Sequence, residues 1–181
     1  MAETELTPAE LESRLARMHE ESFGWALSCC RWDEPDAEDV LQTAYLKVVS
    51  GKARFEGRST FRTWLFGVIR RTALEHHRRS TSQRERAELL AAERPSDGGD
   101  IAAPDEQVVR AEVSQMLLDA LAELPDRQRE VLHLVFYQDL SVREAAEAMD
   151  VSVGSARVHY DRGKKRLRAL LSEKQAWGRA P

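Results

Sequence analysis

Apolar residues recur along this chain at steps of three and four, the spacing that places side chains on one face of an α-helix. The pattern predicts helices from Thr7-Pro8 towards Trp32, from Pro35 to about Ser50, and from a cap at Ser59 as far as Ala92. No stretch alternates convincingly between apolar and polar residues, as a half-buried strand would. The predicted fold class is therefore all-α.

Predicted core positions follow from the same spacing. In the helix after Pro35 they are Ala37, Val40, Leu41, Ala44, Tyr45, Val48 and Val49. In the helix after Ser59 they are Phe61, Trp64, Leu65, Val68 and Thr72. Each set forms one apolar stripe, so each helix has one side to bury.

A segment at 93–104 interrupts this periodicity with two prolines and two adjacent glycines, which is typical of a linker. Helices resume near Asp105: one extends to about Glu123, and Pro125 begins another that ends near Tyr137. We therefore expect two small helical domains, at 7–92 and 108–173, joined by a flexible acidic linker at 93–107.

The last two predicted helices form a helix-turn-helix. Ser141 and Glu144 make a capping box at the start of the first, and 150–152 form the turn. The second helix has a buried stripe of Val153, Ala156, Tyr160, Gly163, Leu167 and Leu170. Its opposite side, with Arg157 and Arg168 at its edges, carries Gly154, Val158, Asp161, Arg162 and Lys165, residues that suit the major groove of DNA. Asp161 would repel phosphate, so we expect it to accept from a base, to pair with Arg157 or Arg162, or to lie beyond contact.

The net charge of -4 conceals an alternation along the chain. Residues 1–51 and 95–150 are acidic, with net charges of -7 and -9, whereas 52–94 and 151–181 each carry +6. Local fields rather than the average charge make a nucleic-acid footprint, and the second basic block coincides with the helix-turn-helix.

The first basic block, from Phe55 to Arg79, interleaves arginines with aromatic residues. Single-stranded nucleic acid requires this combination, because cations follow the backbone and flat rings stack on unpaired bases. Helical spacing supports a competing interpretation, in which Trp64 belongs to the core. The loop from Phe55 to Thr60 is the better candidate for DNA contact.

Other classes of function find little support in the sequence. No apolar run reaches the roughly 18 residues of a membrane span, and the acidic N-terminus does not resemble a secretory signal. Adjacent Cys29 and Cys30 suggest buried thiols in a reduced, cytoplasmic protein. No phosphate loop, nucleophile elbow or metal-ligand spacing is present, so we expect neither an enzyme nor a cofactor.

Four motifs together resemble the extracytoplasmic-function (group 4) sigma factors of bacterial RNA polymerase. They are Asp36-Ala37-Glu38-Asp39-Val40-Leu41-Gln42, Phe55-x-Gly57-x-Ser59-x-Phe61-x-Thr63-Trp64-Leu65, Leu124-Pro125-x-x-x-Arg129-Glu130-Val131-Leu132 and Val153-Gly154-Ser155-x-Arg157. Their order and spacing match over about residues 15–172. The resemblance implies a protein that binds core polymerase and directs it to promoters.

The resemblance also implies roles for particular residues. Docking on the beta-prime clamp helices would involve Asp36, Glu38, Asp39, Gln42 and Tyr45. Melting and reading the -10 element would involve Phe55, Arg58, Ser59, Thr60, Arg62, Trp64, Arg71 and Arg78. Reading the -35 element would involve Ser155, Arg157, Val158, Asp161, Arg162 and Lys165. The implied partners are core polymerase (with the beta flap as a further contact), promoter DNA and an anti-sigma factor, without membrane insertion.

Several residues depart from the family pattern. Thr43 stands where glutamate is frequent and Tyr45 where phenylalanine is usual. Arg71 stands where many members have asparagine, and His159 and Asp161 also differ, so family-typical promoter bases are not assumed. A stand-alone helix-turn-helix regulator is the alternative hypothesis, but it leaves the Phe55–Arg79 block unexplained.

Overall fold

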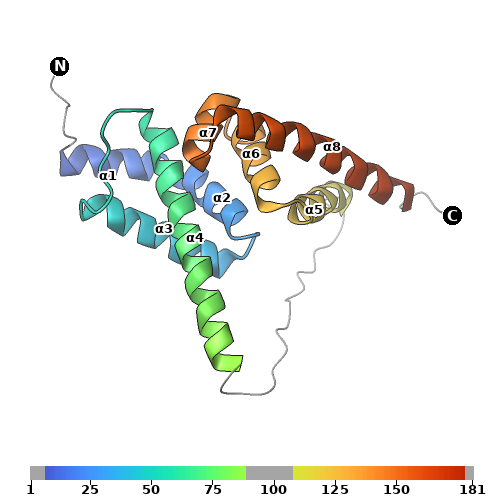
Figure 1. Cartoon of the computed structure of the whole chain (residues 1–181), viewed down its shortest axis with the longest axis horizontal. Coiled ribbons are helices and arrows are strands. Elements are labelled where there is room, and N and C mark those ends of the chain that lie inside the picture. The colour runs from blue at the N-terminus through green and yellow to red at the C-terminus, as the bar shows by residue number, and fades with distance from the viewer. Residues whose placement is uncertain (1–6, 89–107, 178–181) are drawn as a thin grey trace.

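The computed structural model describes residues 7–88 and 108–177, which form eight α-helices and no strand. The all-α prediction is confirmed. Figure 1 shows α1–α4, in blue to green, as one half of the molecule and α5–α8, in yellow to red, as the other, with α7 beside α4. The predicted linker at 93–107 lies outside the described residues.

The first half begins with a reciprocal cap on α1 (Pro8–Arg17). Thr7 Oγ1 accepts from the Glu10 amide at 3.3 Å, and the Glu10 carboxylate accepts from the Thr7 amide at 2.9 Å. The sequence pattern predicted one helical region towards Trp32, but the structure divides it at Met18 and continues as α2 (His19–Cys29). Arg31 and Trp32 then adopt positive φ angles, which turns the chain into α3.

Helix α3 (Glu34–Val49) is capped by Asp33, whose carboxylate accepts from the Asp36 amide at 2.9 Å. Helix α4 (Phe61–Glu88) is capped by Thr60, because Thr60 Oγ1 accepts from the Thr63 amide at 3.1 Å. The prediction that Ser59 caps this helix is therefore wrong by one residue. The predicted apolar positions of α3 are buried except for the half-buried Tyr45 and for Val49, which lies on the outward face of the helix and is 57% exposed.

The second half contains α5 (Val108–Ala122), α6 (Asp126–Phe136), α7 (Val142–Met149) and α8 (Val153–Trp177). The Ser141–Glu144 capping box opens α7, and Asp150 ends it in the left-handed conformation. Ser152 Oγ accepts from the Ser155 amide and so caps α8. A Cβ at Gly163 would lie 3.1 Å from Leu132 Cδ1, so glycine permits the close approach of α6 and α8.

One hydrophobic core continues through both halves. Trp25, Phe66 and Ile69 of the first half belong to the same buried cluster as Leu134 and Ala148 of the second. The two helical domains are therefore packed together in this structure over a common core.

Arg129 of α6 reinforces this packing with three hydrogen bonds. Its side chain, which is 2% exposed, donates to the carbonyls of Ser28 and Leu124 and to the Asp126 carboxylate. The Ser28 carbonyl lies in the first half, at the end of α2. This arginine of the sequence motif thus joins the two halves directly.

His133 of α6 is buried between the halves, among aromatic rings. It stacks on Tyr137 at a centroid distance of 5.3 Å and lies 5.4 Å from the Trp25 ring. Burial lowers its pKa to about 4 from an ordinary value of 6.5. The ring is therefore neutral at pH 7, and its Nε2 can accept from the Gln138 amide, 3.3 Å away.

The buried His133 predicts an acid-sensitive fold. Because the folded-state pKa lies below the unfolded-state pKa, its contribution is fully present above pH 6.5 and is lost as the pH falls towards 4. We expect this residue alone to remove about 3 kcal/mol of unfolding free energy across that window. Urea titrations at several pH values should show a shallower decline for His133→Phe. An equal decline in both proteins would contradict this assignment.

Candidate nucleic-acid interface

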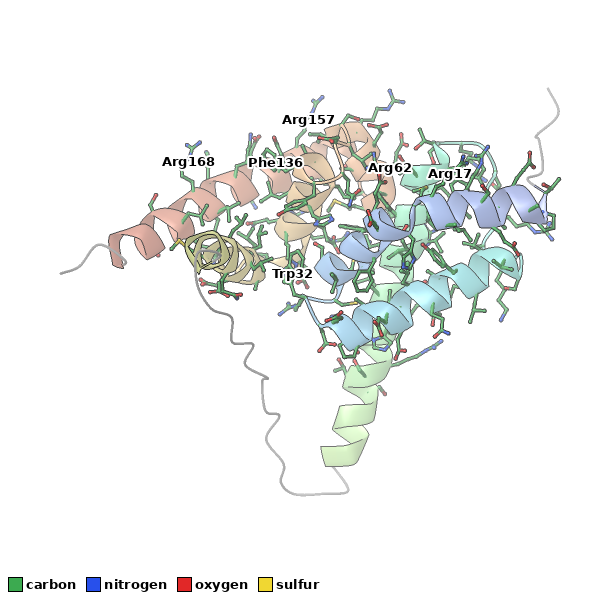
Figure 2. The ribbon with its side chains drawn as sticks, turned by 180° about the vertical axis from the view of Figure 1, so that it is seen from behind. Arg17, Trp32, Arg62, Phe136, Arg157 and Arg168 are labelled. Carbon is green, nitrogen blue, oxygen red and sulfur yellow. The ribbon has the colours of Figure 1, made fainter. Side chains whose placement is uncertain are left out.

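The outward face of α8 is exposed at its predicted DNA-reading positions. Ser155, Arg157, Val158, Arg162 and Lys165 are all exposed. Figure 2 shows Arg157 and Arg168 projecting from the same side of this helix. The structure thus presents one basic surface along α8, as the periodicity predicted.

Asp161 is exposed on this face and pairs with Lys164, with Oδ1 and Nζ 3.3 Å apart. The expected alternatives included pairing with Arg157 or Arg162, and the observed partner is neither. Residues three apart are neighbours on a helix surface, which explains the choice. Lys164 also lies over the Tyr160 ring at 4.1 Å. Asp161 is therefore held by a local ion pair on the exposed face of α8.

Three aromatic rings gather where the loop before α4 meets the start of that helix. The Phe55 ring lies 5.5 Å from Phe61 and 5.4 Å from Trp64, and Phe61 and Trp64 are 5.3 Å apart. Phe61 is buried, whereas Phe55 and Trp64 are only half-buried. One part of the Trp64 side chain therefore packs in the aromatic cluster, and another part is accessible. This position is compatible with both the core interpretation and the DNA-contact interpretation.

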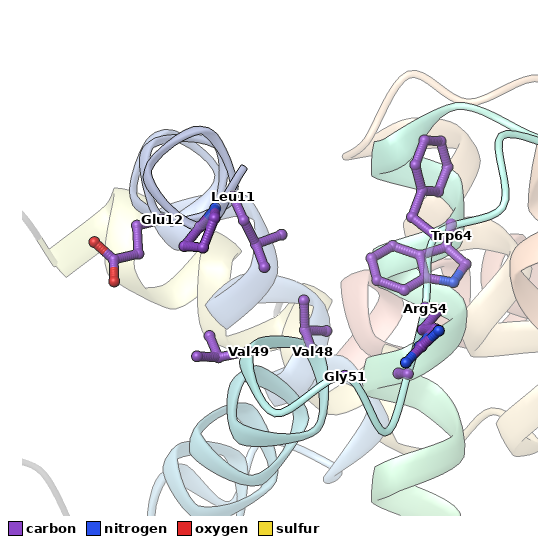
Figure 3. A pocket seen from close by; sticks show the side chains of 10 residues that line it. Leu11, Glu12, Val48, Val49, Gly51, Arg54 and Trp64 are labelled. Atoms are coloured by element: carbon purple, nitrogen blue, oxygen red, sulfur yellow. The ribbon is translucent and has the colours of Figure 1, made fainter. Parts of the chain in front are cut away.

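Two adjacent cavities share Trp64 as a wall. The first, of about 290 Å³, lies between α1, the end of α3 and the aromatic cluster. Figure 3 shows Leu11, Val48 and Val49 on one side of it, with Trp64 and Arg54 on the other. We call it the apolar cavity. Sequence reasoning missed its α1 and α3 walls, because nothing in the local pattern places those helices beside the loop.

The second cavity, of about 320 Å³, also includes Ala53, Arg54 and Trp64 in its wall. Its further lining includes the cations Lys47, Lys52 and Arg71. Glu75 is the acidic member, and its carboxylate is 2.7 Å from Lys47 Nζ. We call it the basic cavity. Lys52 and Arg54 were absent from the predicted site, although both lie in the net-positive segment 52–94.

The remaining predicted -10 residues do not line these two cavities. Arg58 is exposed and pairs with Glu56, Ser59 is half-buried, and Thr60 caps α4. Arg78 is exposed two turns beyond Arg71 on α4. Of the predicted -10 set, the structure therefore brings only Phe55, Trp64 and Arg71 to the walls of the two cavities.

Arg62 lies apart from the two cavities. Its guanidinium is 2.9 Å from the Glu21 carboxylate and donates to the Gln138 side chain at 3.0 Å. Gln138 belongs to the second half, 76 residues along the chain. This arginine contacts the interface between the halves in the structure.

Helix α3 exposes a second candidate surface. Asp39, Gln42, Leu46 and Val49 recur at steps of three and four, and all four are exposed. Glu38 is exposed beside them, whereas Asp36 lies 3.8 Å from His76 and Tyr45 turns towards α2. We call Asp39, Gln42, Leu46 and Val49 the α3 stripe. Acidic residues beside exposed aliphatic side chains are typical of a protein-binding surface.

The second half carries an apolar pocket of about 270 Å³. Leu117, Leu121 and Leu167 form its floor with α6, and Trp32 of the first half completes its wall. Phe136 and Tyr137, which also line it, are each about 60% exposed. Large exposed aromatic residues beside a pocket are common at protein interfaces.

Other kinds of site find no support in the part of the chain that the structure describes. Its histidines, cysteines and carboxylates form no cluster able to hold a metal ion. Burial raises the pKa of the Cys29 thiol and raises that of Cys30 to about 12, so both are protonated at pH 7. No described helix is long and apolar enough to cross a membrane.

Comparison with known proteins matches each half to a separate family description. Residues 19–83 match Sigma-70 region 2, and residues 114–167 match Sigma-70, region 4. The chain is 32% identical over 140 residues to the ECF RNA polymerase sigma factor SigX of Bacillus subtilis, covering 75% of this chain and 71% of that one. It is also 32% identical over 140 residues to the RNA polymerase sigma factor CarQ of Myxococcus xanthus, covering 76% and 75%.

Two solved structures share the fold at 21% sequence identity. One is the sigma factor RpoE of Bartonella quintana in complex with the anti-sigma factor NepR, with a TM-score of 0.69 and coverage of 89% of this chain and 96% of that one. The other is CnrH in complex with the cytosolic domain of CnrY, with a TM-score of 0.63 and coverage of 92% and 90%.

Proposed function

The chain belongs to the ECF RNA polymerase sigma factors of the sigma-70 family, and we propose that it is a group 4 member whose two halves read the -10 and -35 elements. As an alternative sigma factor, it directs RNA polymerase to its promoters. The observation that carries the proposal is that each matched half has its own group of accessible basic residues, around Trp64 in the first half and along α8 in the second. As a partner of core polymerase, the protein would act in the cytoplasm.

The α8 face supports reading of the -35 duplex. Arg157, Arg162 and Lys165 are exposed cations that can donate to guanine acceptors in the major groove, and Val158 can contact a thymine methyl. Asp161 can accept from cytosine once its pair with Lys164 opens. Ser155 lies in the first turn of α8, where backbone amides favour a phosphate.

The two cavities around Trp64 support capture of an unpaired base of the -10 element. The apolar cavity, of about 290 Å³, is larger than the roughly 150 Å³ cavity that holds a benzene ring. A base could enter it against Trp64, while its phosphates follow Lys52, Arg54 and Arg71 in the basic cavity. Stacking and phosphate contacts together would offset the loss of base pairing.

The α3 stripe supports docking on the beta-prime clamp helices. Asp39 and Gln42 provide polar contacts, and Leu46 adds an apolar one that the sequence reading did not include. The apolar pocket of the second half is the candidate contact for the beta flap, because Phe136 and Tyr137 offer exposed aromatic surface there. An anti-sigma factor would compete for one or both surfaces.

Charge reversal at Asp39 tests the docking surface. We expect Asp39→Arg to weaken binding to core polymerase by about 10-fold or more, because it opposes a complementary field, and to leave stability within about 0.5 kcal/mol. Affinity can be measured by fluorescence anisotropy with labelled sigma factor. Glu20→Arg reverses an exposed charge on α2 and should bind normally. An equal loss of affinity in both variants would show that binding to core polymerase depends only on the net charge of the protein.

Run-off transcription with purified core polymerase on pooled genomic fragments tests the whole proposal. New transcripts that depend on the added protein would support it, and their aligned start sites would give the promoter bases. A dimer that binds palindromic duplex without core polymerase, and yields no transcript, would favour the stand-alone regulator.

A further inference from the structure

A further cavity, of about 390 Å³, is lined by residues of α4, of the start of α6 and of α8. Three arginines and two histidines are among its lining residues: Arg70 and His77 on α4, Arg127 on α6, and His159 and Arg162 on α8. Its volume is more than twice the roughly 150 Å³ that accommodates benzene, and it lies in the range of small-molecule sites. The proposed function uses only Arg162 of these five residues, so it does not explain why they gather around one cavity.

Two carboxylates also line this cavity, and both are paired with arginines. Glu130 Oε2 lies 3.0 Å from Arg70 Nε, and the two side chains are 6% and 4% exposed, so this pair forms the buried end of the cavity. Asp126 Oδ1 lies 2.8 Å from Arg129 Nη2 and 3.0 Å from Arg31 Nη2, and neither of those arginines lines the cavity. The charges of both carboxylates are therefore offset, and the other cations of the wall give the cavity a positive field.

The remaining cations of the wall keep donors for a ligand. Arg127 Nη1 donates to the Met149 carbonyl at 3.1 Å, which orients the guanidinium but occupies only one of its five N–H donors. Arg162 is exposed and forms no ion pair with the part of the chain that the structure describes. His159 is half-buried, and His77 is exposed on the α4 wall. These side chains suit an anion with several oxygen acceptors.

Helix α6 begins at this cavity and adds backbone donors to it. Residues 125–128 all line the cavity, and Pro125 provides no side-chain cap. The amides of Gln128 and Arg129 donate to the Pro125 carbonyl, whereas no hydrogen bond within the described residues uses the amides of Asp126 and Arg127. Free amides and the positive end of a helix dipole favour an anion, so the start of α6 reinforces the cations of the wall.

We propose that this cavity binds a small anion that carries two or more phosphate groups. A phosphate has five non-hydrogen atoms and benzene has six, so one phosphate occupies less than half of the volume. One phosphate would lie against Arg127 and the start of α6, and a second against His159 and Arg162. Duplex DNA does not suit the cavity, because its phosphates lie on a convex surface and cannot approach the buried end at Arg70. The proposal goes beyond the proposed function and does not depend on it.

Isothermal titration of the full chain with pyrophosphate tests the site without polymerase or promoter. We expect one pyrophosphate per chain, and we expect Arg127→Gln to weaken its binding at least about 10-fold, because a hydrogen bond to a charged group is lost. Arg143→Gln removes an exposed arginine of α7 that does not line the cavity, and it should bind within about twofold of wild type. Equal weakening in both variants would show a non-specific effect of charge and would overturn the proposal.

A second pair of variants separates binding from folding, since Arg127→Gln also loses the hydrogen bond to Met149. His77 is exposed and lines the cavity, whereas its neighbour His76 does not line it. We expect His77→Gln to weaken pyrophosphate binding about threefold or more at an unchanged melting temperature. His76→Gln should bind pyrophosphate like the wild type. Equal affinities in these two variants would contradict a ligand in this cavity.

Comparison of ligands tests the chemical class. Orthophosphate should bind at least about 10-fold more weakly than pyrophosphate, because it reaches fewer of the cations, and equal affinity would overturn the assignment of two phosphates. The DNA backbone is the other source of phosphate. If neither pyrophosphate nor a nucleoside triphosphate bound, and Arg127→Gln instead weakened binding of promoter duplex, the cavity would be a DNA contact and the proposal would be wrong.

Discussion

Replacing Arg129 with methionine is expected to lower the free energy of unfolding by about 3–5 kcal/mol. The guanidinium donates to the carbonyls of Ser28 and Leu124, and the residue is 1% exposed. Methionine fills much of the space but donates nothing, so both buried carbonyls lose a partner. The Asp126 carboxylate is about half exposed and also pairs with Arg31, so its loss of Arg129 adds less.

Urea denaturation followed by circular dichroism measures this loss. Arg143→Met is the matched control, since its side chain is 80% exposed and pairs only across one helical turn with Glu147. We expect that change to stay within about 0.5 kcal/mol. If Arg129→Met lost no more unfolding free energy than the control, water would have to donate to the Ser28 and Leu124 carbonyls. The hydrogen bond from Arg129 to Ser28 would then contribute nothing to stability.

The helix-turn-helix was predictable from the sequence because local interactions determine it. The Ser141–Glu144 box and the turn at 150–152 appear in the structure. Of the predicted buried stripe, Ala156 and Gly163 are buried, and Val153, Tyr160, Leu167 and Leu170 are half-buried. Capping and helical periodicity act over four residues or fewer, so a sequence shows them directly. The exposed face of α8 then follows, because it lies opposite the buried stripe.

The predicted helix boundaries and core positions were wrong where the sequence has no strong marker or has two equally good ones. No proline or glycine marks the break at Met18, and adjacent hydroxyl residues at 59 and 60 are both good caps. Val49 fits the apolar period of α3, but it lies on the outward face of the helix with Gln42 and Leu46. In each case the local sequence favours two alternatives equally, and packing against other parts of the fold determines which one is adopted.

Residues that depend on distant contacts could not be placed from the sequence. Arg62 is the type of residue that contacts DNA, but in the structure it pairs with Glu21 and donates to Gln138 of the second half. The apolar cavity needs Leu11, Val48 and Trp64 together, from three separate helices. The spacing of residues along the chain carries no information about contacts between helices that are distant in sequence. The motifs therefore indicated the loop before α4 but not the cavity beside it.

Removing the Trp64 ring is the change we expect to affect promoter opening most. Trp64 walls both cavities and packs against Phe55 and Phe61. Stacking of a base on an aromatic ring contributes about 1–3 kcal/mol, so Trp64→Ala should weaken binding of the -10 non-template strand about 5- to 150-fold. Trp64→Phe keeps an aromatic face and should lose much less.

Two measurements separate base capture from simple loss of fold. Anisotropy with a labelled -10 single strand and holoenzyme gives the affinity, and permanganate reactivity of thymines reports promoter opening. Binding of the -35 duplex by α8 should be unchanged in Trp64→Ala, because that surface belongs to the other half. If strand affinity stayed at the wild-type level while urea stability fell, Trp64 would be a packing residue alone, and the captured base would have to stack elsewhere.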